Sequence, residues 1–255
     1  MKKTLLTIIV VMGMSAAIIS CQNGTGNKEE STSKTEPKPT TTTATPLREK
    51  VLTTEEQKAL TPDMVLQSLK DGNKRFASND LTARDHSAMV RNASKAQYPK
   101  AVILSCVDSR IPVEDVFDKG IGDIFVARIA GNFVNVDILG SMEFGCKVSG
   151  AKLILVLGHE SCGAIKAAID DVKLGNITAM LTKIKPAVAR SQNFAGEKSS
   201  KNDAFVEYVA KNNIINTIED IKAKSPILKD MADKGEIKIV SGYYNLKTGE
   251  VTFME

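Results

Sequence analysis

The sequence predicts an α/β domain with a mostly parallel central sheet flanked by helices. Two short runs of branched apolar residues, at 101–104 and 153–157, have the composition of strands that are buried on both faces. Segments with the periodicity of amphipathic helices precede and follow these runs. Strands that alternate with helices in this way are typical of a parallel sheet with helices on both faces.

The first half of the domain begins with a helix predicted at residues 61–79, where Thr61 can cap the free amides and Pro62 fits the first turn. Residues 80–98, which include His86, are polar and are expected to be irregular.

The first strand, at 101–104, is followed by a short helical stretch at 113–117 and a glycine turn. A second apolar run predicts a strand at 123–128. The next helix, at 136–148, is rich in small residues, which suits close packing on a sheet, and Gly150 ends it.

The second half of the domain repeats this alternation. Its strand at 152–157 leads into a helix that opens at Cys162 and runs to residue 172. Two amphipathic helices follow, separated by a polar loop, and a C-terminal hairpin closes the chain. These last elements are predicted at residues 176–189 and 205–223 for the helices, and at 236–241 and 251–254 for the hairpin strands.

The N-terminus has the pattern of an export signal, predicted at residues 1–20. Two lysines precede an apolar stretch that is short for a membrane span. The stretch ends I-I-S-C and resembles a bacterial lipobox, in which Cys21 is lipidated and becomes the first residue. The alternative is an ordinary signal peptide that is cut nearby.

Residues 21–50 are predicted to be the lipidated N-terminus and a flexible linker, because they contain almost no apolar residue that could be buried. We therefore expect an exported protein, anchored at a membrane surface by lipid and facing the periplasm or the cell exterior. Residues 51–255 are predicted to form one globular domain.

Charge and cysteine content argue against a nucleic-acid-binding protein and against a disulfide scaffold. The formal net charge of +4 comes without a basic stripe interleaved with aromatic residues, so nucleic acid is not an expected partner. Only four cysteines are present, and two of them lie beside a histidine and an aspartate, which argues against a disulfide scaffold.

Two polar motifs stand at the ends of the predicted buried strands. C-V-D-S-R occupies residues 106–110, and G-H-E-S-C-G occupies residues 158–163. Ligand sites of open α/β sheets collect at the carboxyl ends of the strands, so these motifs are expected to meet. Two thiolates and an imidazole suit Zn²⁺, although a closed structural zinc site or two unrelated core cysteines remain open at this point.

The two motifs, with G-N at 131–132 and L-x-x-G-N-x-R-F at 69–76, resemble the β-class carbonic anhydrases. The resemblance implies one zinc ion held by Cys106, His159 and Cys162. It also implies that Asp108 and Arg110 form the catalytic pair of that family, and that Asp108 can become the fourth ligand in a closed state. The implied reaction is reversible hydration of CO₂ to bicarbonate and a proton through a zinc-bound hydroxide.

Pocket residues follow less directly from the motifs. The amide of Gly163 is at a helix start and can donate to a bicarbonate oxygen, with tight helix packing as the alternative role for this glycine. Phe133 and Ile138 are possible walls of a CO₂ pocket, and ordinary core residues otherwise. His86 is expected to be a solvated surface histidine rather than a proton shuttle.

The chain also departs from the family pattern. Ile129 stands where many members have asparagine, Gly120 stands where plant-type members have glutamine, and no tryptophan is present to build the secondary bicarbonate site of some members. The resemblance further implies a homodimer or a dimer of dimers.

Three other functions are compatible with parts of the pattern. A zinc hydrolase of a CO₂ analogue, such as carbon disulfide or carbonyl sulfide, would keep the fold and the metal. An inactive zinc-binding lipoprotein would not need the Asp108 and Arg110 pair. A thiol redox protein is the weakest alternative, because the chain has no C-x-x-C motif.

Overall fold

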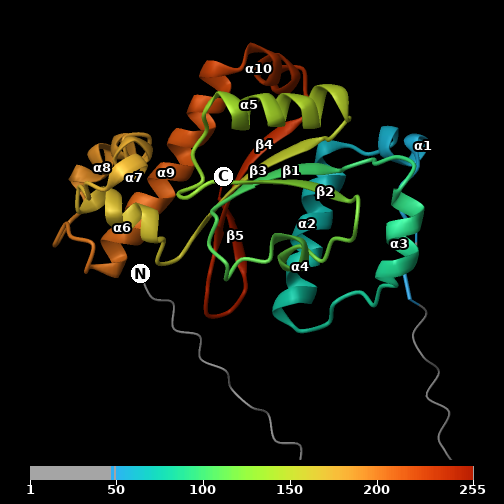
Figure 1. The fold of residues 1–255 in the computed structure, drawn as a ribbon, viewed down its shortest axis with the longest axis horizontal. Helices are drawn as coiled ribbons and strands as arrows, with labels where there is room; N and C mark the ends of the chain where they lie inside the picture. Colours follow the sequence, from blue (N-terminus) through green and yellow to red (C-terminus); the bar gives the residue numbers. More distant parts are fainter. Residues whose placement is uncertain (1–46, 49, 255) are drawn as a thin grey trace, which may run out of the picture. The chain divides into compact units, whose positions relative to one another are not determined.

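The computed structural model describes residues 47, 48 and 50–254, which belong to one compact unit. The predicted signal peptide at 1–20, the lipidation site Cys21 and nearly all of the linker at 21–50 lie outside the described residues. Figure 1 shows a central sheet with helices packed on it. Within the described part of the chain, no helix has both the length and the apolar composition needed to cross a bilayer.

The sheet has five strands in the order β2-β1-β3-β4-β5. The strands are β1 (Ala101–Ser105), β2 (Ile124–Arg128), β3 (Leu153–His159), β4 (Lys238–Tyr244) and β5 (Val251–Met254). The four strands β1 to β4 run parallel, and only β5 is antiparallel to its neighbour β4. The predicted mostly parallel sheet is confirmed, and the predicted hairpin corresponds to β4 and β5.

The helices surround the sheet. They are α1 (Thr54–Lys58), α2 (Pro62–Ala77), α3 (His86–Ala93), α4 (Val113–Val116), α5 (Val136–Glu143), α6 (Gly163–Ile169), α7 (Gly175–Leu181), α8 (Lys185–Arg190), α9 (Asp203–Lys224) and α10 (Pro226–Asp233). A π-helical turn η1 (Phe144–Val148) extends α5, and a 3₁₀ turn η2 (Ser191–Asn193) follows α8.

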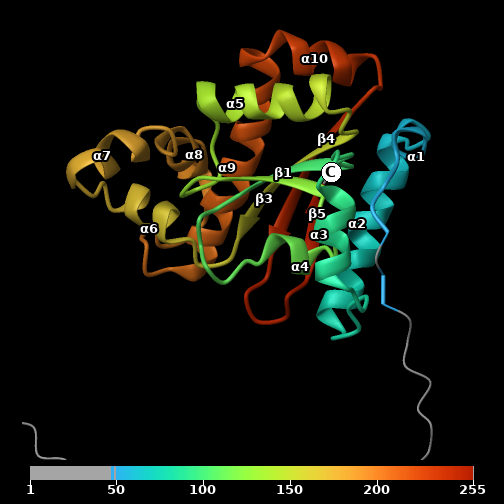
Figure 2. The same cartoon turned by 45° about the vertical axis from the view of Figure 1, so that its right-hand side comes forward.

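Two hydrophobic cores lie on the two faces of the sheet. Side chains alternate between the faces of a strand, so Val102 and Leu104 belong to one core and Ala101 and Ile103 to the other. The larger core packs against α5, α6, α8, α9 and α10, and the smaller one against α2 and α4. Figure 2 shows these two groups of helices on opposite sides of the sheet. The central strands β1 and β3 are therefore buried on both faces, which fixes the ends that carry the polar motifs.

The prediction of irregular structure at residues 80–98 was wrong for residues 86–93, which form α3. Asp85 caps this helix by accepting a hydrogen bond from the Ala88 amide at 2.9 Å, and Ala88 and Met89 are buried. The long helix predicted at 176–189 is instead two helices, α7 and α8, joined by a turn at residues 182–184. Helices α1 and α10 were not predicted.

Candidate metal centre

Cys106, His159 and Cys162 meet at the carboxyl ends of β1 and β3. Cys106 follows the last residue of β1, His159 ends the neighbouring parallel strand β3, and Cys162 precedes the first residue of α6. One sulfur or nitrogen atom of each residue lies within 4.8 Å of the other two. The three residues are 4%, 1% and 1% exposed, so their donor atoms surround a buried point between strand ends and a helix start.

The imidazole of His159 is oriented as a ligand would be. Its Nδ1 lies 2.9 Å from the Glu160 carbonyl oxygen, and because a carbonyl can only accept, Nδ1 must carry the proton. The other nitrogen, Nε2, is then a bare lone pair. It is buried and has no hydrogen-bond partner among the described residues, which is costly unless a cation binds there.

The Cys106 and Cys162 thiols interact with each other in this buried place. Donation from the Cys162 thiol lowers the pKa of Cys106 to about 4, and the Gly131 amide adds an N–H···S contact of 3.4 Å. The same hydrogen bond, together with burial, raises the pKa of Cys162. The two sulfur atoms therefore interact closely enough to share a proton. A divalent cation that displaced it would meet two sulfur donors and one nitrogen donor, which is the donor set that Zn²⁺ prefers.

Asp108 lies beside this cluster and is held by Arg110. Its Oδ1 accepts from Arg110 Nε at 2.9 Å and from the Arg110 amide at 3.0 Å, and its Oδ2 accepts from Nη2 at 2.7 Å. This two-pronged hydrogen bonding lowers the pKa of Asp108 to about 2. Oδ2 also lies 4.0 Å from Nε2 of His159. Of the two orientations implied for Asp108, the structure has the one with the Arg110 contact intact.

Arg128, at the end of β2, fixes the loop that carries Cys106 and Asp108. Its Nη1 donates to the carbonyl oxygens of Cys106 at 3.2 Å and Asp108 at 3.3 Å, and its Nη2 donates to that of Ile111. This role was not predicted from the sequence. A charged residue that ends a strand of apolar residues was the available signal, but no pattern indicates that three carbonyl groups of another loop would face it.

A turn at Gly131 and Asn132 supports the Cys106 sulfur. Gly131 has φ +83°, and a Cβ atom there would lie 2.4 Å from Cδ1 of Ile184, so only glycine fits. Helix α9 holds the turn from outside, because Asn213 donates to the Gly131 carbonyl at 2.8 Å and Thr217 donates to the Asn132 carbonyl at 3.2 Å. The amide that faces Cys106 is therefore rigidly placed.

The remaining predicted residues occupy different environments. Gly163 is exposed, and a Cβ atom on it would meet no heavy atom within 4 Å, so close packing does not explain this glycine. Phe133 is buried in the larger core together with Cys106 and Cys162, and Ile138 packs against that core. His86 is exposed at the start of α3, as expected for a solvated histidine. Burial raises the pKa of Cys146 to about 12.

Comparison with known proteins identifies the family. A family model described as "Carbonic anhydrase" matches residues 101–251, which contain both motifs and the strands β1 to β4. The chain belongs to the carbonic anhydrase family. Carbonic anhydrase 2 of Mycobacterium tuberculosis is 30% identical over 203 residues, which cover 76% of this chain and 93% of that protein. A carbonic anhydrase of Mycolicibacterium smegmatis is 32% identical over 197 residues, covering 74% and 92%.

Solved β-class structures confirm the fold of this carbonic anhydrase family member. A tetrameric β-carbonic anhydrase of Sordaria macrospora aligns with a TM-score of 0.59 at 18% identity, covering 75% of this chain and 95% of that chain. The Coccomyxa β-carbonic anhydrase in complex with acetazolamide aligns with a TM-score of 0.58 at 22% identity, covering 74% and 84%. The predicted α/β fold is the fold of these proteins.

Proposed function

We propose that this chain is a zinc-dependent carbonic anhydrase that interconverts CO₂ and bicarbonate, with Cys106, His159 and Cys162 as the zinc ligands. The observation that carries the proposal is the convergence of these three buried donors beside an Asp108 carboxylate that Arg110 holds in place. Membership of the carbonic anhydrase family supports the choice of reaction. Zinc held by these residues would supply a Lewis acid that lowers the pKa of a water toward 7.

Asp108 is proposed to orient the attacking water. Because Arg110 keeps the pKa of Asp108 near 2, the Asp108 side chain is a carboxylate at any working pH and can only accept hydrogen bonds. A water that donated one proton to Oδ2 would keep a lone pair free to attack CO₂. Arg110 acts by positioning this carboxylate, and Arg128 acts by positioning the loop that carries it.

Gly163 and Phe133 are proposed as substrate contacts. The open space around Gly163 lets a substrate oxygen approach its backbone amide, in agreement with the proposed donor role. Phe133 packs in the same core as two of the proposed ligands and would supply an apolar wall for CO₂. These residues are proposed to bind substrate and are not proposed to move protons.

The exposed apolar surface along β2 favours a homodimer or a dimer of dimers. Strand β2 is at the edge of the sheet, and a groove of about 570 Å³ beside it is lined by Phe125, Ala127, Ile138 and Phe144 among others. Phe144 is exposed, as are Val107, next to Cys106, and Val136. An apolar sheet edge of this kind is unfavourable in water and is a suitable surface for a second copy. The oligomeric state in solution can be measured by light scattering.

The residues on which a location can be proposed lie outside the described part of the chain. We propose export, acylation of Cys21 and attachment to a membrane surface, facing the periplasm or the cell exterior. The supporting observation is the I-I-S-C sequence after an apolar stretch. Metabolic labelling with a fatty acid, compared between the wild type and Cys21→Ser, tests the acylation.

Stopped-flow CO₂ hydration, measured with and without a zinc chelator, tests the proposed reaction. We expect activity that disappears with the chelator and returns when zinc is added. Turnover of carbonyl sulfide or carbon disulfide without CO₂ hydration would favour the analogue hydrolase instead. Stoichiometric zinc without any of these activities would favour the inactive zinc protein. An Asp115→Asn variant, altered at an exposed carboxylate on α4, is the matched control for Asp108→Asn.

A further inference from the structure

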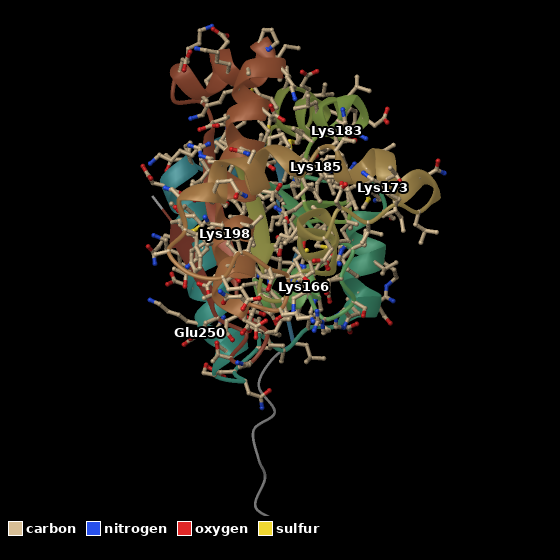
Figure 3. All side chains as sticks on the ribbon, turned by 90° about the vertical axis from the view of Figure 1, so that its left-hand side faces the viewer. Lys166, Lys173, Lys183, Lys185, Lys198 and Glu250 are labelled. Carbon is tan, nitrogen blue, oxygen red and sulfur yellow. The ribbon has the colours of Figure 1, made fainter. Side chains whose placement is uncertain are left out.

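Helices α6 to α8 and the loops around them form a face that is rich in lysine. Residues 163–203 contain seven basic and four acidic side chains, which gives this segment a formal charge of +3. Figure 3 shows five lysines spread over the face that these helices present. We call this surface the lysine face, and its lysines are Lys166, Lys173, Lys183, Lys185 and Lys198.

Part of this positive charge is not neutralised by the residues that the structure describes. Lys173 and Lys185 share the carboxylate of Asp171, so two cations have one acidic partner. Lys183 and Lys198 are exposed, and neither forms an ion pair with any acid in the described part of the chain. The lysine face therefore carries a surplus of positive charge that an anionic surface could neutralise.

Aliphatic side chains project next to these lysines. Val172, Leu174 and Ile177 are 37%, 63% and 40% exposed, and Lys173 stands between the first two. Among the residues of α7, Leu181 alone is buried, so the helix is held to the domain mainly at its C-terminal end. Exposed aliphatic residues interleaved with lysine are typical of segments that lie in the interface of a bilayer, where the chains enter the headgroup region and the ammonium groups stay at its surface.

We propose that the lysine face, with the aliphatic tip at residues 172–177, docks on an anionic bilayer surface. Lipid phosphates would neutralise Lys183 and Lys198, and Leu174 would enter the headgroup region. A water-soluble polyanion would satisfy the lysines but would leave the aliphatic tip in water, so the bilayer accounts for both features. This docking is independent of the proposed metal site, and it is separate from acylation of Cys21, which would only bring the surface close.

The test uses the full chain with Cys21→Ser, so that no acyl group contributes to binding. Co-sedimentation is measured with phosphatidylcholine vesicles that contain or lack phosphatidylglycerol. We expect binding only to the anionic vesicles, and weaker binding as salt is added. The double variant Lys183→Glu/Lys198→Glu is expected to weaken this binding by more than about tenfold. The matched control is Lys58→Glu/Lys95→Glu, because these exposed lysines lie on α1 and after α3, on the opposite side of the domain in Figure 1.

A second variant separates a bilayer from other anionic partners. Leu174→Ser is expected to weaken binding to anionic vesicles several-fold while leaving its salt dependence unchanged. No binding of the Cys21→Ser chain to anionic vesicles, or an equal loss in the control variant, would overturn the proposal. A third outcome would also overturn the proposal. If Leu174→Ser bound anionic vesicles with unchanged affinity, and inorganic polyphosphate competed fully with the vesicles, the lysine face would be a site for soluble polyanions. CO₂ hydration in solution, measured on the same samples, reports separately on the proposed function.

Discussion

The Asp108 carboxylate accepts two side-chain hydrogen bonds from the Arg110 guanidinium, while its Oδ2 remains 4.0 Å from the unpaired Nε2 of His159. Arg110 thus holds the carboxylate near the three donors without filling the space between them. If Asp108 orients the attacking water, removing the charge of its side chain should reduce the turnover rate strongly and should reduce zinc binding much less. The Asp108→Asn variant is expected to retain zinc and to lose about 100-fold to 1000-fold in kcat.

Zinc content and stopped-flow rates, measured on the same preparation, check this expectation. The control Asp115→Asn should match the wild type in both. Wild-type turnover in Asp108→Asn would remove the role assigned to the carboxylate. Loss of zinc in that variant would instead show that Asp108 contributes mainly to metal retention.

Arg128 offers a test of loop positioning. Its guanidinium donates to three carbonyl groups of the 106–111 loop, a geometry that the single ammonium of lysine cannot reproduce. We expect Arg128→Lys to lower kcat/KM by roughly tenfold to 100-fold with zinc content near the wild-type value, because small displacements of catalytic groups are costly. Arg190→Lys, at an exposed ion pair with Glu219, is the control. Equal rates in the two variants would exclude the positioning role.

Gly131 should be sensitive to the smallest side chain. In Gly131→Ala, the new methyl group would meet Ile184 and the backbone would keep a positive φ. We therefore expect the free energy of unfolding to fall by about 2–4 kcal/mol. Ile184→Ala should lower the free energy of unfolding less in the Gly131→Ala protein than in the wild type, because the smaller side chain removes the clash. Urea unfolding of the four proteins measures this coupling. Strict additivity would contradict the contact.

A buried ion cluster around Asp118 predicts a pH dependence of stability. Burial tends to raise the pKa of Asp118, but hydrogen bonds from Thr82, Arg75 and Arg84 outweigh it and lower the pKa to about 2. A carboxyl whose pKa is lowered on folding stabilises the fold above its unfolded pKa, near 4, and loses that contribution as pH falls toward 2. At neutral pH the contribution is about 2–3 kcal/mol.

Asp118→Asn should therefore be less stable than the wild type at neutral pH, and the difference should shrink between about pH 4 and pH 2. Denaturant unfolding at a series of pH values measures it. Asp233→Asn, at an exposed pair with Lys229, is expected to show little difference at any pH. A constant difference across the series would contradict the lowered pKa.

The strands that are buried on both faces could be predicted from the sequence, because they appear as continuous runs of apolar residues. Residues 101–104 and 153–157 became β1 and β3 because both faces of these strands are covered, and the motifs that follow them met as predicted. The helix α3 was missed because only Ala88 and Met89 are buried, which leaves too short an apolar pattern among polar residues. The turn between α7 and α8 was missed because the apolar spacing continues across it.

The candidate site was predictable in its members but not in its supports. Residue types and strand ends indicated a possible zinc site, and the resemblance to the β-class carbonic anhydrases selected Cys106, His159 and Cys162. The contacts of Arg128 with a separate loop, and those of Asn213 and Thr217 with the turn after β2, depend on tertiary packing. Local sequence patterns carry no information on such distances, so these residues emerged only from the structure.

X-ray absorption at the zinc edge of the purified protein tests the central claim most directly. With one zinc per chain, we predict two sulfur ligands at about 2.3 Å and nitrogen or oxygen ligands at about 2.0–2.1 Å. Two sulfur ligands on one zinc ion require two cysteines that are close together. Cys106 and Cys162 are the pair that the structure brings together. A zinc ion bound only by nitrogen and oxygen, or a protein that binds no zinc, would contradict the account.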